Sequence, residues 1–463
     1  MNLGLSELRL VKNAEIINGG ESVNKFSGVS IDSRSCRKND LFIAIRGERF
    51  DGHDFVLQAV ERGIKCAVVK KKWYKNLSEK SRRSLKKTCV VLVSDTITAL
   101  GEIASLYRRK FAIPVIGIGG SNGKTTTKDL IAAVLAGSYS VLKTEGNYNN
   151  HIGVPLTLFR LRSHHEIAVI ELGINRHGEM TYLAEIAQPQ FAVITNIGRE
   201  HMEYLGRVKE IARAEAELVN YIKRVYGTFI KNTDDSHVNK MGRSLRIKKF
   251  TYGSAGRPDV KGRLVRMRRF FPEIQITYRH NIININLNIA GYQGYQSALS
   301  AAATGIYFDV PLKTVKQILS EFQTCLTGRN NLLNINGTWI IDDTYNSNPD
   351  SVTGALNNLK LYNTSGEKYI VLGDMLELGK YSAREHKAIG RLIRKLRFRN
   401  LFTFGNEAYN IFKGAKGIEN NFYFTDKKLL AEVLKSMIRK NDLVLVKGSR
   451  KMQMEDIIME LKG

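Results

Sequence analysis

The sequence has little proline and cysteine, and it lacks long hydrophobic runs. Only 7 of its 463 residues are proline, and its hydrophobic content of 43% is typical of a globular protein. Its four cysteines are far apart and show no C-x-x-C spacing: Cys36, Cys66, Cys89 and Cys325. This pattern argues against a zinc site or a disulfide framework and suits a reducing compartment, so we expect a cytoplasmic protein. The N-terminus resembles no signal peptide and no apolar run reaches membrane-spanning length, so we expect no integral membrane association.

Acidic residues are scarce relative to basic ones. The chain has 44 Asp and Glu against 71 Lys and Arg, a formal charge of +27, with basic clusters at 70–87, 243–269 and 391–399. One interpretation is attraction to an anion such as nucleic acid, a membrane surface or a polyanionic substrate; the other is a lysine-rich bias on solvated faces. The clusters are not interleaved with aromatic residues as a base-stacking platform would be. We therefore favour solvated faces for most of this charge and expect no nucleic-acid partner.

Glycine is concentrated in one informative stretch, residues 117–128, which read Gly-Ile-Gly-Gly-Ser-Asn-Gly-Lys-Thr-Thr-Thr-Lys. An apolar run precedes it and a helical pattern follows it, which is the context of a phosphate-binding loop. The usual G-x-x-x-x-G-K-[ST] pattern would need glycine where Ile118 stands, and a glycine-rich turn with a chance lysine is the alternative. The loop predicts binding of a nucleoside triphosphate and Mg²⁺, with these contact residues: Gly119, Gly120, Ser121, Asn122, Gly123, Lys124, Thr125 and Thr126.

Three α/β units are predicted along the chain, at residues 1–110, 111–325 and 326–463. In the central unit, apolar runs at 167–173 and 191–198 end in polar residues and glycine, which predicts a parallel sheet covered by helices on both faces. Residues 248–288 alternate between apolar and polar and predict an antiparallel excursion. The third unit again alternates strand and helix patterns. The predicted fold class is therefore α/β, with a small first domain, a central sheet of the P-loop ATPase kind and a Rossmann-like third domain.

Several polar residues stand where a nucleotide site is expected. Glu171 ends a buried strand, so it is a candidate metal ligand, with a capping or turn carboxylate as the alternative. His201 is a candidate ligand of metal or phosphate, although a lone histidine is as often structural. Arg329, at the start of the third unit, is a candidate to reach the γ-phosphate. Because no activated serine or cysteine nucleophile is evident, we expect chemistry by positioning and charge neutralisation.

The sequence resembles the Mur ligases, the ATP-dependent amide-forming enzymes of peptidoglycan synthesis, and among them those that add D-alanyl-D-alanine. The resemblance covers all three units. It rests on the phosphate loop and on the motifs at 32–34, 40–42, 51–53, 146–155, 171–179, 195–201, 342–349, 372–379 with His386, and 447–449. The Asp-Asn-Pro-Arg box of the diaminopimelate-adding relatives is absent, because residues 347–350 read Ser-Asn-Pro-Asp.

The resemblance implies a reaction and a set of roles. ATP phosphorylates the terminal carboxylate of UDP-N-acetylmuramoyl-tripeptide, and the amine of D-alanyl-D-alanine attacks the acyl phosphate. Lys124, Glu171, His201 and Arg329 are the implied catalytic residues, and Asp343 joins the ATP contacts. Thr125, Glu171 and His201 are implied Mg²⁺ ligands. The implied substrate contacts are Asp32, Ser33, Arg34, Asn149, Asn150, His386, Lys447 and Ser449. A monomer working in cell-wall biogenesis is expected.

Two departures from the family pattern stand out. Residues 291–298 read Gly-Tyr-Gln-Gly-Tyr-Gln-Ser-Ala, where relatives show Gly-x-His-Asn-x-x-Asn-Ala on the adenine side. In addition, Glu215 occupies the position of a lysine that relatives carbamylate to make a carboxylate for Mg²⁺. Glu215 falls on an apolar helical stripe, which makes an unpaired carboxylate costly. We expect it to supply the metal-binding charge directly; an exposed helix or a buried arginine partner are the alternatives.

Two other functions remain open from the residues. One is a different acid–amino-acid ligase of the same superfamily, such as a folylpolyglutamate synthase or another Mur ligase. The motifs of the first unit argue against a folate ligase, which lacks a uridine-binding unit of this type. The other is a basic, nucleotide-dependent nucleic-acid-binding protein, which would show salt-dependent DNA binding and DNA-stimulated ATPase activity.

Overall fold

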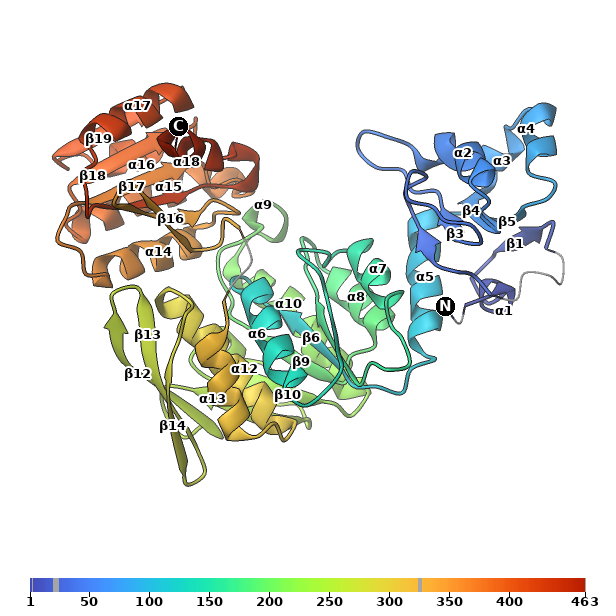
Figure 1. The fold of residues 1–463 in the computed structure, drawn as a ribbon, viewed down its shortest axis with the longest axis horizontal. Coiled ribbons are helices and arrows are strands. Elements are labelled where there is room, and N and C mark those ends of the chain that lie inside the picture. Colours follow the sequence, from blue (N-terminus) through green and yellow to red (C-terminus); the bar gives the residue numbers. More distant parts are fainter. Residues whose placement is uncertain (2, 20–24, 324–326, 463) are drawn as a thin grey trace. The chain divides into compact units, whose positions relative to one another are not determined.

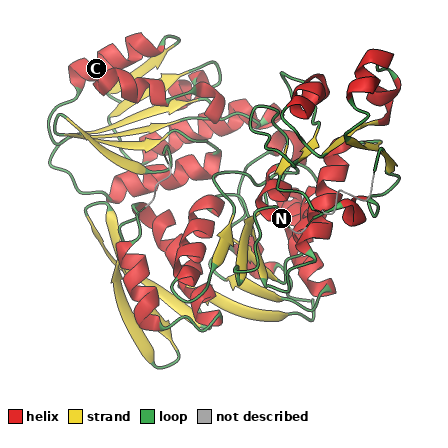
Figure 2. Ribbon diagram, turned by 45° about the vertical axis from the view of Figure 1, so that its right-hand side comes forward, coloured by secondary structure: helices red, strands yellow, loops and turns green. Residues whose placement is uncertain are grey.

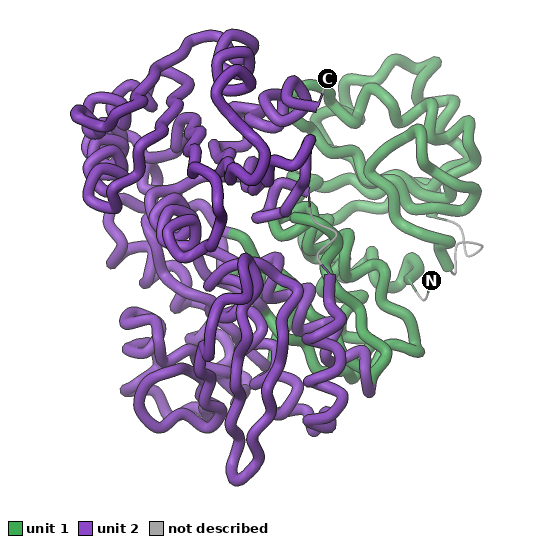
Figure 3. Tube along the Cα trace, turned by 60° about the vertical axis from the view of Figure 1, so that its left-hand side comes forward, with its two compact units in different colours: residues 1–117, 139–173, 181–190 green, residues 118–138, 174–180, 191–463 purple. Residues whose placement is uncertain are grey.

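The computed structural model describes residues 1, 3–19, 25–323 and 327–462, and these residues form three sheets covered by helices (Figures 1 and 2). The predicted α/β class is confirmed. Clustering of contacts divides the chain into two compact units (Figure 3): residues 1–117, 139–173 and 181–190 form unit 1, and residues 118–138, 174–180 and 191–463 form unit 2. The predicted boundary between 325 and 326 lies outside the described residues, and the three domain ranges stay a prediction.

The first sheet has five strands in the order β1-β5-β4-β3-β2. Its strands are β1 (Glu15–Ile17), β2 (Val29–Ser30), β3 (Leu41–Ile43), β4 (Cys66–Lys70) and β5 (Cys89–Val93). Strands β2 to β5 pair in parallel, and β3 and β5 are buried along their whole length, as near-continuous apolar runs require. The helices are α1 (Leu5–Leu8), α2 (Val56–Glu61), α3 (Lys71–Lys75), α4 (Glu79–Ser84) and α5 (Thr96–Arg108). The basic stretch 70–87 contains the two short helices α3 and α4.

The second sheet has nine strands in the order β14-β13-β12-β11-β10-β9-β6-β8-β7. They are β6 (Val115–Gly119), β7 (Val141–Lys143), β8 (Ile167–Glu171), β9 (Phe191–Ile194), β10 (Thr228–Asn232), β11 (Lys248–Gly253), β12 (Val260–Arg268), β13 (Phe271–Tyr278) and β14 (Asn281–Asn286). The predicted antiparallel excursion is correct for β12–β14 but wrong for β11, which pairs in parallel with β10 and β12. A strand's alternation of apolar and polar residues reports its exposed face and not its pairing direction.

Eight helices of the described chain accompany this sheet. They are α6 (Lys124–Ala136), α7 (Gly153–Leu158), α8 (Glu179–Ala187), α9 (Met202–Leu205), α10 (Val208–Arg224), α11 (Ser236–Lys240), α12 (Gly291–Tyr307) and α13 (Leu312–Glu321). Helix α6 packs along α12, whose buried side is rich in glycine, alanine and serine. This packing places the start of α12 beside the phosphate loop.

The third sheet and its helices, residues 327–462, are called the C-terminal module here. The sheet order is β15-β16-β20-β17-β18-β19, and only the β15–β16 pair is antiparallel. Its strands are β15 (Asn331–Ile335), β16 (Thr338–Asp343), β17 (Lys368–Gly373), β18 (Asn400–Phe404), β19 (Asn420–Phe424) and β20 (Leu443–Lys447). Helices α14 (Pro349–Leu361), α15 (Ser382–Lys395), α16 (Tyr409–Gly414), α17 (Lys427–Met437) and α18 (Glu455–Lys462) cover it. The carboxyl ends of β16, β17 and β20 meet at one edge, where a doubly wound sheet binds ligands.

The structure bears on two expectations from the composition, which concern the cysteines and membrane-spanning helices. Cys36, Cys66 and Cys89 are free and buried, and Cys325 lies outside the described residues. None of the helices formed by described residues is both long enough and apolar enough to cross a lipid bilayer.

Candidate active site

The phosphate loop, residues 119–125, joins β6 to α6. Gly120 has φ +110° and Gly123 has φ +77°, and a Cβ at Gly120 would come within 2.3 Å of the Thr195 hydroxyl oxygen. Both positions therefore require glycine, because other residues rarely adopt this backbone region and the space is filled. Gly123 immediately precedes Lys124, the first residue of the 13-residue helix α6. The loop leads directly into a helix N-terminus, a natural site for phosphate.

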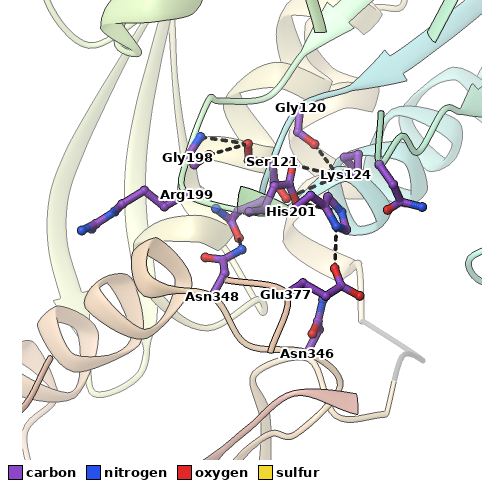
Figure 4. A network of polar contacts seen from close by, with 12 residues as sticks. Gly120, Ser121, Lys124, Gly198, Arg199, His201, Asn346, Asn348 and Glu377 are labelled. Carbon is purple, nitrogen blue, oxygen red and sulfur yellow. Dashed lines mark hydrogen bonds and ion pairs between the residues drawn. The ribbon is translucent and has the colours of Figure 1, made fainter. Parts of the chain in front are cut away.

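A second segment, residues 195–201, supports the phosphate loop through backbone and amide contacts. It is called the supporting loop here. The Asn196 side chain accepts from the Asn122 N–H at 3.0 Å and donates to the Asn122 carbonyl at 2.9 Å. The Ser121 hydroxyl accepts from the Gly198 N–H at 2.8 Å (Figure 4). These contacts fix the shape of the phosphate loop before any nucleotide binds, so little ordering cost remains for binding.

Lys124 is held by its own loop and by one carboxylate. Its ammonium group donates to the carbonyls of Gly120 and Ser121 (Figure 4). It also lies 3.7 Å from a carboxylate oxygen of Glu200. Both side chains are largely shielded, with 15% and 12% of their surface exposed. Glu200 was missed in the sequence analysis, although it stands next to His201. The Lys124 cation is thus fixed beside the helix N-terminus, where phosphate oxygens are expected.

His201 lies in the left-handed region, with φ +49°, and pairs with the C-terminal module. Its Nδ1 lies 2.6 Å from Oε2 of Glu377 (Figure 4). Its Nε2 lies 3.9 Å from a carboxylate oxygen of Glu200. Burial lowers the pKa of His201, but the Glu377 hydrogen bond and the charge of Glu200 together raise it above its ordinary value. The same hydrogen bond lowers the pKa of Glu377. In this structure His201 is therefore a hydrogen-bond partner of Glu377, and its role as a ligand of metal stays a prediction.

Glu215 is buried in the stripe that the sequence predicted. Only 1% of its surface is exposed, and its Oε2 accepts from the Gly120 N–H at 2.7 Å. Burial raises the pKa of Glu215 to about 7, although Lys124 and the Gly120 N–H favour the charged form. Neither alternative from the sequence holds, because the helix face is buried and the observed partner is a backbone amide. A carboxyl held neutral by burial gains its charge when a cation binds.

The remaining loop residues have supporting positions. Thr125 is 1% exposed, and the Thr127 hydroxyl donates to Ser297 of α12 at 3.0 Å. A Cβ at Gly123 would come within 2.3 Å of the amide nitrogen of Gln293. Two of the positions that depart from the family pattern, Gln293 and Ser297, therefore lie directly against the phosphate loop and α6. Substitutions there bear on nucleotide contacts, as the resemblance implies.

The C-terminal module contacts the phosphate loop at one residue and the supporting loop at another. The Asn348 side chain donates to Asn122 at 2.9 Å. Arg199 of the supporting loop donates to Asp350 at 3.0 Å and to Glu385 at 2.8 Å, with about a third of its side chain exposed. Sequence reasoning missed both contacts, since they join residues more than 150 positions apart and involve ordinary surface residue types.

Removing Arg199 should lower activity by loosening the supporting loop. Arg199→Ala breaks charge-assisted hydrogen bonds that are partly exposed, so we expect kcat/KM for ATP to fall roughly tenfold. Arg384→Ala is the matched control, because Arg384 also pairs with Glu385, at 2.7 Å, but has 66% of its side chain exposed and has no contact with the supporting loop among the described residues. Equal effects of the two variants on steady-state kinetics would show that the Arg199 contacts do not position the loop.

A lysine–carboxylate pair lies at the carboxyl edge of the C-terminal sheet. Lys447 is 2% exposed and donates to Asp343 at 2.6 Å and to the Asn346 carbonyl at 2.8 Å. Burial raises the pKa of Asp343, against the opposing charges of Lys447 and Arg329. The Arg329 guanidinium lies 3.7 Å from the ring centroid of Tyr345. The structure thus brings the predicted residues Arg329, Asp343 and Lys447 together at one edge.

Ser449 and His386 stabilise the loop after β17. Ser449 accepts from the Leu376 N–H at 2.8 Å. His386 is fully buried, its Nε2 accepts from the Met375 N–H at 2.9 Å, and its Nδ1 lies 2.8 Å from the Ser382 carbonyl. Both ring nitrogens are therefore engaged within the module, an arrangement suited to positioning this loop. Direct substrate contact by His386 stays a prediction from the resemblance.

Acid should destabilise the protein through His386. Burial lowers the pKa of His386 below its ordinary value of 6.5. The unfolded chain then binds more protons than the folded one below pH 6.5, so stability is full above that value and falls as the pH drops towards the folded pKa. We expect the pH dependence of the thermal midpoint between pH 7.5 and 5 to weaken in His386→Gln but not in His280→Gln, whose side chain is exposed. An identical pH profile in all three proteins would contradict this prediction.

Glu171 belongs to unit 1 and is described there. It is 1% exposed at the end of β8, and its Oε1 accepts from the Asn149 amide at 2.8 Å. Asn150 accepts from the N–H groups of Ile152 and Gly153 at 3.0 and 2.9 Å, and so caps the start of α7. Among the described residues, no group of three or more His, Cys, Asp and Glu is arranged to hold a metal. The metal role of Glu171 therefore rests on its sequence motif.

The predicted uridine end forms a compact turn in unit 1. Arg34 pairs with Asp32 at 2.8 Å, and this pairing lowers the pKa of Asp32 to about 2. Arg34 nevertheless has 83% of its side chain exposed. Ser33 is buried and donates to Gln58 at 2.7 Å. Of the three predicted contact residues, Arg34 is thus the one whose hydrogen-bond donors are largely exposed to solvent.

Comparison with known proteins places this architecture in a family. Models of the Mur ligase family catalytic domain, the Mur ligase middle domain and the Mur ligase glutamate ligase domain match residues 25–108, 118–305 and 328–450. The chain is also 36% identical, over 98% of both sequences, to a curated relative from Bacillus subtilis. The chain belongs to the Mur ligase family, which confirms the resemblance.

The particular relatives share one name. The Bacillus subtilis protein is a UDP-N-acetylmuramoyl-tripeptide–D-alanyl-D-alanine ligase, as is a Haemophilus influenzae protein that is 33% identical over 100% of this chain and 99% of its own. Crystal structure I of MurF from Acinetobacter baumannii superposes with a TM-score of 0.89 at 29% identity, covering 99% of this chain and 98% of that one. MurF ligase from Thermotoga maritima, in complex with ADP, gives 0.81 at 26% identity, with 94% and 97% covered.

Proposed function

We propose that this chain is an ATP-dependent ligase that joins D-alanyl-D-alanine to UDP-N-acetylmuramoyl-tripeptide through an acyl-phosphate intermediate. The observation that carries the proposal is the phosphate loop before α6, held by the supporting loop and contacted by Asn348 of the C-terminal module. A triphosphate bound there meets groups from the central sheet and from the C-terminal module together. The names of the full-length relatives supply the substrates.

The reaction needs stabilisation of negative charge at two stages. The terminal carboxylate of the tripeptide attacks the γ-phosphorus, ADP leaves, and the acyl phosphate forms. The amine of D-alanyl-D-alanine then attacks the acyl carbon, loses a proton, and phosphate departs with the former carboxylate oxygen. The Lys124 ammonium and the N–H groups that begin α6 face the transferring phosphoryl group. Arg329, beside Asp343 and Lys447, contributes a second cation from the C-terminal module.

Mg²⁺ is proposed as the metal that accompanies ATP, and the residues present fit it. Mg²⁺ prefers oxygen ligands and supplies charge neutralisation of the phosphates. Thr125 offers a hydroxyl and Glu215 a carboxylate, and each residue has only 1% of its surface exposed. Burial raises the pKa of Glu215 despite the nearby charge of Lys124, and a bound metal ion would add further positive charge beside this carboxyl. For Glu171 and His201, metal binding remains a proposal from their motifs.

The other roles are proposals from the family motif and the local geometry. Arg34, with Asp32 and Ser33, contacts the uridine nucleotide, and Asn149 and Asn150 contact the substrate. Lys447 and Ser449 shape the acceptor side, where His386 acts through the loop after β17. We further propose that the enzyme acts as a monomer in the cytoplasm, where ATP and nucleotide-linked precursors are available.

A substrate panel tests the proposed function. Phosphate release from ATP is measured with UDP-N-acetylmuramoyl-tripeptide and, in turn, D-alanyl-D-alanine, D-alanine, L-lysine, diaminopimelate and D-glutamate. We expect fast release only with D-alanyl-D-alanine, and none when the UDP-linked tripeptide is left out. Faster release with a single amino acid would assign the chain to another acid–amino-acid ligase activity. Release stimulated by random-sequence DNA in place of both substrates would favour a nucleic-acid-binding protein.

A further inference from the structure

The positive charge of the chain is unevenly distributed. Residues 241–290 contain eleven Lys or Arg and only two Asp or Glu, a net +9 of the total +27 in about a ninth of the chain. Strands β12, β13 and β14 lie within this range, beyond β11 at the end of the nine-stranded sheet. Helices α12 and α13 cover one face of these strands (Figure 1). The register of the strands determines which of the basic side chains lie on the other, uncovered face.

The register aligns four cations on the uncovered face of β12. Ile274 and Ile276 of β13 are buried, so their strand neighbours Glu273, Gln275 and Thr277 point the other way. These outward residues pair directly with residues of β12, and Phe271 continues the same face. The outward residues of β12 are Lys261, Arg263, Arg266 and Arg268, opposite Thr277, Gln275, Glu273 and Phe271.

A β-bulge makes this alignment possible. The register shifts between Leu264 and Arg266, so Val265 is the extra residue. Without it, the strict alternation of a strand would place Arg263 and Arg266 on opposite faces. With it, all four basic residues share one face, about 7 Å apart along the strand. The insertion of one residue thus converts a basic stretch of sequence into a row of cations.

Most of these cations have no acidic partner. Arg266 pairs with Glu273 at 2.7 Å and still has 69% of its side chain exposed. Lys261, Arg263 and Arg268 are exposed and form no ion pair with any part of the chain that the structure describes. The neighbouring strands contribute amides, with Gln275 donating to Asn284 at 3.1 Å. The face therefore has excess positive charge, because three of its four cations form no ion pair with the described residues.

A pocket and two apolar side chains complete this surface. The pocket lies at the Lys261 end, where its lining includes Arg257, Lys261 and Arg279. Its one acidic residue, Asp259, accepts from the N–H and hydroxyl of Thr251 at 2.7 and 2.6 Å. Ile282, opposite Thr277 on β14, is 60% exposed, and Val265 is 44% exposed. Cations and isolated apolar side chains thus occur together on one sheet face.

We propose that the outward face of β12–β14, which is called the cationic face here, is a docking surface for an anionic membrane. A row of cations attracts acidic lipid headgroups, and each Lys or Arg near such a surface strengthens binding about fivefold. Exposed Ile282 and Val265 fit the boundary between headgroups and acyl chains, where apolar side chains are favoured. A nucleic acid fits less well, because single strands need a row of stacked aromatic residues. Among the described residues, Phe271 lies on the outward face, and Phe250 and Tyr278 line the pocket at its Lys261 end. The contact is peripheral and reversible, and it leaves the ligase site unchanged.

Vesicle binding tests the proposal. The full chain is mixed with vesicles of equal phosphatidylglycerol and phosphatidylcholine, or of phosphatidylcholine alone, and the bound fraction is measured by flotation. We expect binding only to the anionic vesicles and loss of binding at high salt. Lys261→Gln/Arg263→Gln/Arg268→Gln removes the three unpaired cations, so its partition coefficient should fall about a hundredfold. Ile282→Ser should weaken binding severalfold.

The matched control removes the same charge elsewhere. Lys80→Gln/Lys86→Gln/Lys87→Gln also lowers the net charge by three at exposed positions of unit 1, and it should stay within about threefold of the wild type. Unaltered ligase turnover verifies that both triple variants are folded. Equal losses in the two triple variants would show that net charge and not the cationic face drives binding. No binding to anionic vesicles, or tighter binding of the wild type to random duplex DNA at the same salt, would also overturn the proposal.

Discussion

Lys124→Ala should lose at least about a thousandfold of ATP-dependent phosphate release while the protein stays folded. The ammonium group lies at the start of α6 beside its own loop carbonyls and Glu200, so it faces charge that develops on the phosphates. Its contacts are local, since they are made with two carbonyls of its own loop and with Glu200. The free energy of unfolding should therefore change by less than about 1 kcal/mol. Steady-state phosphate release and thermal unfolding measure the two effects separately.

Lys427→Ala is the matched control for this substitution. Lys427 is likewise the first residue of a helix, α17, and it pairs with Asp456 at 2.7 Å in the C-terminal module. We expect this variant to turn over ATP at the wild-type rate. Near-normal turnover by Lys124→Ala, or an equal loss in both variants, would remove the phosphate loop from the mechanism.

Glu215→Gln should lose most of the activity, roughly a hundredfold or more, because it removes a charge expected at the metal. Glutamine keeps the size of the side chain and a group that can accept from the Gly120 N–H, so the loop should keep its shape. Wild-type activity should be indifferent to the removal of bicarbonate, since Glu215 supplies a carboxylate without carbamylation. Glu215→Lys should be weak and partly restored by added bicarbonate. A wild-type requirement for bicarbonate, or full activity of Glu215→Gln, would contradict this role.

The same substitution should have the opposite effect on stability. The folded pKa of Glu215, about 7, exceeds its ordinary value of 4.5, so the folded chain binds more protons than the unfolded one between these values. The contribution of Glu215 to stability therefore falls as the pH rises from 4.5 to 7, by roughly 3 kcal/mol in total, and this cost persists above pH 7. In the absence of nucleotide, Glu215→Gln should unfold at a higher temperature than the wild type at pH 8 and at a similar one at pH 4.5. A lower midpoint at pH 8 would show that the carboxylate stabilises the metal-free protein.

The sequence predicted those features that depend on local pattern. The phosphate loop follows from glycines before a helix, and Gly120 and Gly123 do have positive φ. The burial of Glu215 followed from the spacing of apolar residues around it, because helix periodicity decides which side chains face a core. The alternation of apolar strands with helices predicted parallel sheets, because the helices that connect parallel strands cover both faces of the sheet.

The pairs that complete the site could not be predicted in this way. Glu200 and Glu377 are common residue types in polar segments, and their partners depend on how distant segments pack. Arg199 meets Asp350 only because the end of one sheet and the start of α14 lie together. The direction of β11 was mispredicted on similar grounds, since pairing direction is set by chain topology. Long-range packing carries no local signature in a single sequence.

The most direct test of the account follows one oxygen atom through the reaction. UDP-N-acetylmuramoyl-tripeptide labelled with ¹⁸O in its terminal carboxylate is incubated with ATP, Mg²⁺ and D-alanyl-D-alanine, and the phosphate and peptide products are analysed by mass spectrometry. Attack of the carboxylate on the γ-phosphorus and departure of phosphate from the acyl carbon predict one ¹⁸O atom in the released phosphate, together with a UDP-linked pentapeptide. Unlabelled phosphate, or ATP hydrolysis without a pentapeptide product, would contradict the account.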